Sequence, residues 1–366
     1  MDMALQNEIG TARKEIVSDG YDMSIGELAS LYERNEIVIS PAFQRLFRWD
    51  PSRKTRFIES LLLGIPTPPI FVYQDESGVW ELIDGLQRLS TIFEFMGILI
   101  GDDDQPREPL RLEGTTFLPS LSSKVWNAED KDTIGKELQL SIKRARMRVE
   151  ILKQESHPQA KYELFQRLNT GGASLSEQEV RNCIAIMLNP EFYDWLSALS
   201  EETPFQTTIS QTERALAQQS DMELALRFFA FRRHPYTPGL NVHEYLDEAL
   251  IKLATDNEID LEVEAEIFRS SFALLYEILG DDSFKKWDGN QFGGKFLMSR
   301  FEVISTGIST LIAGDENNLP ANDIILNKIK ALEDNEIFQR YSGAGISGSE
   351  RLKNLLPLAS DYFING

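Results

Sequence analysis

The stretch Glu81-Leu82-Ile83-Asp84-Gly85-Leu86-Gln87-Arg88-Leu89-Ser90-Thr91 (ELIDGLQRLST) decides how the first half of the chain is interpreted. An apolar run over residues 79–83 has the composition of a strand, and it stops at Asp84. From about Gln87 to Leu99, apolar residues return at helical spacing. The stretch therefore predicts a strand that turns directly into a helix, with polar and flexible residues at the junction.

This junction has the composition of an anion-binding site. A helix N-terminus exposes unpaired N–H groups and carries partial positive charge, which attracts phosphate. Gly85 permits a turn that a side chain hinders, and Arg88 adds a planar set of donors for phosphate oxygens. Asp84 is either the helix N-cap or a group that polarises water or holds a phosphate-bound metal. Gln87 is suited to orient a water or read a base edge.

A purely structural interpretation accounts for the same residues. Asp84 then caps the helix, Gly85 turns the chain, and Gln87 and Arg88 lie in solvent. Residue types alone leave the two interpretations evenly balanced.

Capping and alternation patterns predict the other elements of the first half. Helix starts are expected at Ser24, at Asp50-Pro51 and at Ser176. Strands are expected over residues 37–39, 70–73, 79–83 and 147–152, and residues 101–121 have the composition of a polar loop.

From Pro190 onward, helical patterns dominate and strand signals are almost absent. Helices are expected over residues 222–231, 242–253, 267–279, 296–311 and 324–332. The fold class is therefore α+β, with one domain over residues 20–188 and an all-helical domain over residues 189–366.

The composition limits the location and the partners. A hydrophobic fraction of 42% and a charged fraction of 26% are typical of globular proteins. No apolar run reaches the roughly 18 residues that a membrane helix needs, and we expect neither a signal peptide nor a membrane partner. The single cysteine, Cys183, excludes an intrachain disulfide and favours a cytoplasmic location. The net charge of −21 disfavours nonspecific DNA binding by the whole surface.

Two local basic clusters contrast with this acidic background. One combines residues 45–56 with Arg88, and the other covers residues 143–148. A local basic pocket suits a small anion or a confined nucleic-acid contact. For the second cluster, a solvated face is an equally good interpretation.

Two further segments place polar side chains beside predicted helix ends. Residues 43–50 (FQRLFRWD) interleave arginines with aromatic residues, which suits base stacking and phosphate contact. Alternatively, the aromatic residues pin a loop to the core. Residues 165–176 (FQRLNTGGASLS) place a glycine pair before a helix start. An ordinary helix cap is the favoured interpretation there, and an anion-binding nest is permitted.

Several common sites lack their sequence signatures. The chain has no Gly-x-x-x-x-Gly-Lys-Ser/Thr loop and no His-Glu-x-x-His motif. Its three histidines, His157, His234 and His243, have no local metal-ligand spacing. No Gly-x-Ser-x-Gly motif supports a serine nucleophile.

Taken in order, the three polar segments resemble the domain-of-unknown-function 262 family. This is the N-terminal domain of GmrSD-type modification-dependent restriction proteins, related to the ParB and sulfiredoxin superfamily. The residues that carry the resemblance are Phe43-Gln44-Arg45 with Trp49-Asp50, Ile83-Asp84-Gly85-Leu86-Gln87-Arg88-Leu89-Ser90-Thr91, and Phe165 with Leu168-Asn169-Thr170-Gly171-Gly172 and Leu175-Ser176. The family pattern Asp-Gly-Gln-Gln-Arg is broken where Leu86 replaces the first glutamine, and we expect Leu86 to face the core.

The resemblance implies a ParB/sulfiredoxin-like domain with a small mixed sheet and flanking helices. It implies binding and hydrolysis of a nucleoside triphosphate in anti-phage defence, with Mg²⁺ as a candidate cofactor and no assigned metal ligand. The catalytic residues would be Asp84, Gln87 and Arg88. The nucleotide-binding residues would be Phe43, Gln44, Arg45, Gly85, Ser90, Thr91, Arg167, Asn169 and Gly171.

Two alternatives use the same pocket. In one, the chain is a non-catalytic sensor that binds DNA through the pocket and its basic rim. In the other, it is a protein-interaction module. We find no His-Asn-His nuclease pattern in the sequence, so we expect DNA cleavage to come from a nuclease partner protein.

Overall fold

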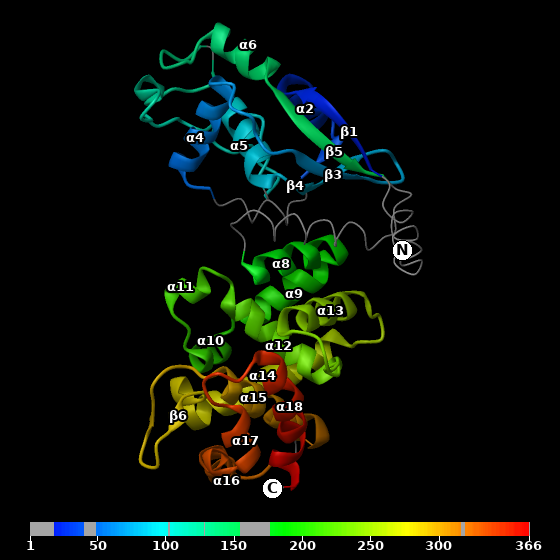
Figure 1. The fold of residues 1–366 in the computed structure, drawn as a ribbon, viewed down its shortest axis with the longest axis vertical. Helices are drawn as coiled ribbons and strands as arrows, with labels where there is room; N and C mark the ends of the chain where they lie inside the picture. The colour runs from blue at the N-terminus through cyan, green and yellow to red at the C-terminus, as the bar shows by residue number, and fades with distance from the viewer. Residues whose placement is uncertain are drawn as a thin grey trace, which may run out of the picture. The chain divides into compact units, whose positions relative to one another are not determined.

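The structure is a computed structural model, and it describes residues 18–39, 49–101, 103–127, 129–153, 176–315 and 319–365. The chain divides into two compact units, Met1–Ala173 and Ser174–Gly366. Each unit is described by itself below. The expected α+β class, with a sheet-containing first part and a helical second part, is confirmed (Figure 1).

The first unit is built on a mixed five-stranded sheet in the order β1-β5-β3-β4-β2. β1 pairs antiparallel with β5, β5 parallel with β3, β3 antiparallel with β4, and β4 parallel with β2. The strands are β1 (Ser18–Ser24), β2 (Ile37–Val38), β3 (Ile70–Gln74), β4 (Trp80–Asp84) and β5 (Arg146–Leu152). Four of them were expected from the sequence.

β1 is the strand that the sequence analysis missed. Its segment SDGYDMS is mostly polar, and Met23 is its one buried residue. The strand is held by register pairing with β5, from Ser18 opposite Leu152 to Ser24 opposite Arg146. Tyr21 at the middle of β1 pairs with Val149, 128 residues later in the chain. Because this distant partner stabilises the strand, its own sequence needs little hydrophobic alternation and gives little signal to detect.

Two helices of the first unit begin at the predicted caps. Ser24 accepts a hydrogen bond from the Glu27 amide, and Asp50 accepts one from the Arg53 amide next to Pro51. The helices are α2 (Ile25–Glu33), α4 (Pro51–Leu62), α5 (Leu86–Met96) and α6 (Lys136–Arg144). α6 was not anticipated, because Ile142 is its only buried residue and the apolar pattern is correspondingly weak.

The connection between α5 and α6 contains the expected loop over residues 101–121. Within its described part it holds the short 3₁₀ helix η1 (Pro119–Leu121) and two isolated bridges, Ile100–Pro106 and Val125–Thr133. The Glu113 amide donates to Thr55 Oγ1 at 3.0 Å, and the Thr115 hydroxyl donates to the buried Glu59 carboxylate. These bonds hold the loop against α4.

The second unit consists mainly of helices, as expected. The small hairpin of β6 (Lys286–Trp287) and β7 (Phe292–Gly293) is its one described sheet. The elements are α8 (Glu177–Leu188), α9 (Pro190–Ser200), α10 (Thr203–Ile209), α11 (Glu213–Leu216), α12 (Ser220–Arg233), α13 (Val242–Thr255), α14 (Leu261–Leu279), η2 (Gly280–Asp282), α15 (Met298–Asp315), α16 (Asn322–Ala331), η4 (Leu332–Asp334), α17 (Glu336–Tyr341) and α18 (Gly348–Asn365).

α8 begins at the predicted cap. The hydroxyl of Ser176 accepts from the Glu179 amide, and the Glu179 carboxylate accepts from the Ser176 amide. This helix was expected in the first domain, over residues 20–188, whereas the compact units divide before it.

Aromatic rings form the apolar core of the second unit. Phe228 and Phe229 of α12 contact Phe268 of α14 with centroid distances of 5.2 and 5.5 Å. Phe205 of α10 and Phe272 lie 4.7 Å apart in an edge-to-face arrangement. All five rings are buried, and such contacts add packing energy beyond area burial.

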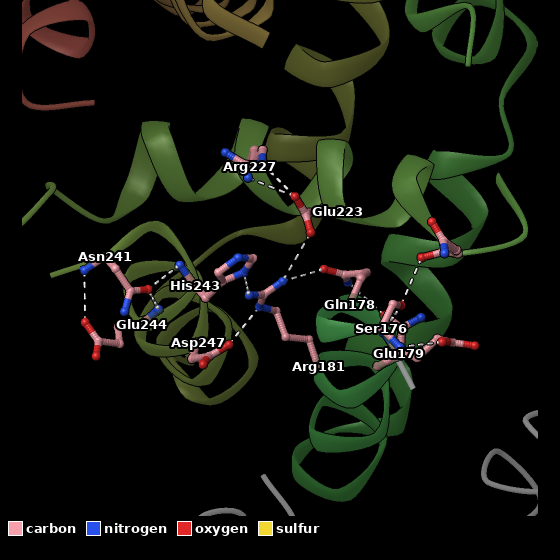
Figure 2. A network of polar contacts seen from close by, with 12 residues as sticks. Ser176, Gln178, Glu179, Arg181, Glu223, Arg227, Asn241, His243, Glu244 and Asp247 are labelled. Carbon is pink, nitrogen blue, oxygen red and sulfur yellow. Dashed lines mark hydrogen bonds and ion pairs between the residues drawn. The ribbon is translucent and has the colours of Figure 1, made fainter. Parts of the chain in front are cut away.

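A buried arginine joins three helices of the second unit (Figure 2). Arg181 of α8 is fully buried, and its Nε donates to Asp247 of α13 at 2.7 Å. Its Nη1 lies 3.4 Å from a Glu223 carboxylate oxygen on α12, and its Nη2 lies 3.0 Å from His243 Nδ1. Because a guanidinium only donates, His243 Nδ1 must accept, and its ring proton is on Nε2.

Alternating charges extend this network to the C-terminal helix. Arg227 Nη2 donates to Glu223 at 2.8 Å, and its Nη1 lies 3.6 Å from Glu302 of α15. Glu302 is fully buried and accepts from Arg351 of α18 at 2.6 and 2.9 Å. Because each buried charge has an opposite neighbour, removing one partner leaves the others uncompensated.

We expect Arg181→Met to destabilise the protein by about 3–5 kcal/mol, since Asp247 and Glu223 lose their buried cation. Chemical denaturation followed by circular dichroism measures the change. The control is Arg269→Met, because Arg269 is half exposed in its pair with Glu202 and should matter by less than about 1 kcal/mol. Equal effects of the two substitutions would contradict this account.

The same network predicts a pH dependence. Burial by itself raises the pKa of Glu223, but the charges of Arg227 and Arg181 outweigh it and the net pKa is lowered from 4.5. A lowered folded-state pKa adds stability above the unfolded value, and this stability is lost as pH falls through the folded value. The stability difference between wild type and Glu223→Gln should therefore be largest near neutral pH and shrink below pH 4.5. A difference that stays constant with pH would argue against it.

Candidate functional site

The strand-to-helix junction of the first unit depends on a glycine. Gly85 lies between β4 and α5 with φ 106° and ψ 12°, a left-handed conformation. A Cβ built at this position would lie 2.4 Å from Ile70 Cγ2 on the neighbouring strand β3. Gly85 is therefore required by both its backbone conformation and the close approach of β3.

Asp84 and Arg88 form an ion pair across this turn. Arg88 Nη2 donates to Asp84 Oδ2 at 2.5 Å, and the two side chains are 13% and 28% exposed, respectively. The N-cap position belongs to Gly85, which offers no side-chain hydrogen bond. The interpretation of Asp84 as the cap and of Arg88 as a solvated side chain is therefore wrong. Asp84 is the last residue of β4 and holds Arg88 at the helix start.

Gln87 connects the junction to a second predicted segment. Its Oε1 accepts a hydrogen bond from the backbone amide of Trp49 at 3.0 Å. The Trp49 ring packs edge-on against Phe57 of α4, with centroids 5.6 Å apart. The described end of residues 43–50 therefore lies against the N-terminus of α5, and a pocket shared with the rest of that segment stays a prediction. Gln87 is thus engaged in protein contacts, contrary to the purely structural expectation of a solvated side chain.

Ser90 and Thr91 lie on the buried side of α5. Both side chains are fully buried, and the Thr91 hydroxyl donates to the Gln87 carbonyl at 2.6 Å. The Ser90 hydroxyl has no hydrogen-bond partner within the part of the chain that the structure describes. In this conformation both residues pack inside the unit, and their assignment to nucleotide binding stays a prediction.

The remaining predicted contacts lie outside the described residues. These are Phe43, Gln44, Arg45, Arg167, Asn169 and Gly171. Their assignment to nucleotide binding stays a prediction. The third segment, residues 165–176, is described only at Ser176, whose hydroxyl also donates to the Gln218 carbonyl at 3.1 Å.

One polar pair beside the junction was missed by the sequence analysis. Lys54 of α4 forms an ion pair with Glu94 of α5 at 2.7 Å, and both side chains are 12% exposed. The pair fixes α5 against the helix that follows Trp49. The two residues are 40 positions apart, and lysine and glutamate are frequent residue types. No local sequence pattern therefore reveals the pair.

The described residues hold no cluster of three or more His, Cys, Asp or Glu side chains suited to a metal ion. Asp84 is the one acidic residue of the junction, and Arg88 already engages it. A magnesium ion at this place would therefore depend mainly on phosphate oxygens and water, which is common for Mg²⁺ bound with nucleotides.

Most of the excess negative charge belongs to the second unit. Residues 174–366 contain 31 of the 58 acidic residues but only 16 of the 37 lysine and arginine residues. The junction thus belongs to the less acidic unit. The electrostatic repulsion of an anion there is therefore weaker than the net charge of −21 suggests.

Gly85→Ala should destabilise the protein by about 3 kcal/mol or more. The alanine would have to adopt a left-handed φ that disfavours side chains, and its Cβ would push Ile70 and strand β3 away. The matched control is Gly78→Ala, with φ 87° and no nearer neighbour than Gln74 Nε2 at 3.8 Å. The control should lose only the backbone contribution, about 1 kcal/mol. Thermal unfolding of both variants tests this, and equal losses would contradict the close-approach argument.

Comparison with known proteins identifies the first part of the chain. Residues 25–186 match the model of the GmrSD restriction endonuclease N-terminal domain. Neither the curated proteins nor the solved structures gave a match. The matched range begins with α2, includes the Asp84–Arg88 junction and ends within α8. Residues 25–186 are therefore similar to a GmrSD-type N-terminal domain, which suggests a restriction or anti-phage defence system.

Proposed function

We propose that the chain is a nucleotide-binding and nucleotide-hydrolysing regulator of such a restriction system, with the β4–α5 junction as its phosphate site. The observation that carries the proposal is Arg88, held by Asp84 at the start of α5. Within the described residues, the bond to Asp84 is the only hydrogen bond of the guanidinium. Several of its five donors are thus available for phosphate oxygens.

The surroundings of Arg88 favour a preorganised anion site. The side chain is only 13% exposed, so bound phosphate would displace little ordered solvent and would meet a guanidinium already in place. It lies at a helix N-terminus whose first amides have no side-chain cap. The helix dipole and the guanidinium therefore act on the same anion.

Asp84 and Gln87 have supporting roles in this proposal. Asp84 orients Arg88, and we assign its carboxylate to polarising a water or holding a phosphate-bound Mg²⁺ at the same place. Gln87 accepts from the Trp49 amide and so sets the end of residues 43–50 against the junction. We propose that Phe43, Gln44 and Arg45 complete the nucleotide pocket from that segment, and that Arg167, Asn169 and Gly171 complete it from the third.

Positioning and charge stabilisation are most of what phosphoryl transfer requires, so a site of this kind can hydrolyse a nucleotide without a covalent intermediate. In the proposed system, nucleotide turnover controls DNA cleavage carried out by a nuclease partner protein. A relationship to the ParB and sulfiredoxin superfamily stays a prediction. Among the described helices, none is long and apolar enough to cross a membrane.

The test is nucleoside triphosphate binding and hydrolysis by the purified protein with Mg²⁺. Arg88→Ala should lower kcat/KM for the preferred nucleotide by about 10–100-fold, the worth of a charge-assisted hydrogen bond. Arg88→Lys should recover only part of the activity, because a lysine lacks the planar fork. The control is Arg34→Ala, an exposed arginine paired with Glu36 on the same unit.

If wild type neither binds nor hydrolyses any of the four common nucleotides, the proposal fails. Binding of DNA instead, with affinity that falls steeply with salt and depends on Arg88, would support the non-catalytic DNA sensor.

A further inference from the structure

A surface groove of about 520 Å³ lies between the C-terminal end of α4 and helix α6. One wall is formed by Leu61, Leu62 and the following Gly64. The other is a single face of α6, where residues 137, 140, 141 and 144 follow the i, i+3, i+4, i+7 spacing of a helix stripe. A stripe with this spacing is the surface that another helix packs against.

The two segments that line this groove carry exposed apolar side chains, of which Leu140 belongs to the lining itself. Leu63 and Ile65, which follow α4, are 45% and 51% exposed, and Leu138 and Leu140 of α6 are 41% and 39% exposed. Single exposed apolar residues are ordinary on protein surfaces. Here four large ones occur in two short segments that also line the groove, and such clustering is typical of interaction sites.

The α6 stripe carries opposite charges at its two ends. Glu137 lies in the first turn and Arg144 in the last, with Leu140 and Ser141 between them. Neither charge forms an ion pair with any described residue. Their spacing of seven residues, about 10 Å along the axis, is too long for them to pair with each other.

We propose that a second copy of this chain fills the groove, with the two α6 helices packed antiparallel about a two-fold axis. Reversing the stripe Glu137-Leu140-Ser141-Arg144 places Glu137 opposite the partner's Arg144 and Arg144 opposite the partner's Glu137. Leu140 then meets the partner's Ser141 next to the axis. A two-fold interface requires a self-complementary surface, and this stripe is complementary to its own reverse.

The charge pattern also rejects the competing arrangement. Two parallel copies of α6 would place Glu137 against the partner's Glu137 and Arg144 against the partner's Arg144, and like charges in contact are destabilising. Leu63, Ile65 and Leu138, which neighbour lining residues in the sequence, are further exposed apolar side chains on these two segments. A nine-residue helix and its border form a small interface, so the dimer should be weak, with Kd on the order of 10 µM.

Analytical ultracentrifugation of the full chain at about 1–200 µM tests the proposal against a monomer mass of 41.7 kDa. Wild type should shift from monomer to dimer over this range. Glu137→Arg and Arg144→Glu should each remain monomeric, because each creates like-charge pairs across the axis. The double variant Glu137→Arg/Arg144→Glu should dimerise again, because it restores both pairs in reversed order.

Mixing the two single variants gives an independent check. One copy then carries two positive charges on the stripe and the other two negative charges, so the mixture should form a heterodimer although each variant alone does not. The control is Lys131→Glu, a charge reversal at an exposed residue outside the groove lining, which should leave dimerisation unchanged. A wild type that stays monomeric throughout, or a dimer that neither single variant weakens, would overturn the proposal.

Discussion

The close approach of Gly85 to Ile70 is the constraint on which the first unit depends. Gly85 lies between β4 and α5, and a side chain there would collide with Ile70 of β3. The pairing of β3 with β4 and the direct start of α5 therefore both require a residue without a side chain. The same turn brings Asp84 and Arg88 together, because residues i and i+4 on either side of a tight strand-to-helix turn point to one place. The proposed phosphate site is thus a direct product of the backbone geometry that connects the sheet to its helix.

The second unit is held by a different kind of interaction. Aromatic packing supplies its apolar core, and a chain of alternating charges from Arg181 to Arg351 passes through α8, α12, α15 and α18. Apolar contacts tolerate many arrangements, whereas buried charges require one particular set of partners. The family match ends within α8, the helix that carries Arg181. This arginine therefore joins the last helix of the matched region to α12 and α13.

Prediction from sequence succeeded where the signal is local. Ser24, Asp50 and Ser176 were identified as helix starts because a cap acts on amides two or three residues away. β1 and α6 were missed because each is polar and depends on distant partners. Asp84 was left between two interpretations for a related reason. A cap and a group that polarises water or holds a phosphate-bound metal can use the same carboxylate. The structure excludes the cap, because Gly85 occupies the N-cap position, and the other role stays a prediction.

The sequence by itself determined the α+β class, the helical second half, the strand-to-helix junction and the similarity of residues 25–186 to a GmrSD-type N-terminal domain. Each of these depends on periodicity, on caps or on a short motif, and such signals involve only residues that are close together in the sequence. Only the tertiary structure decided that Asp84 binds Arg88, that Gln87 holds Trp49, and that the α6 stripe borders an open groove. Those contacts depend on the path of the chain in space, because their energies come from residues that meet only after the sheet and helices have packed.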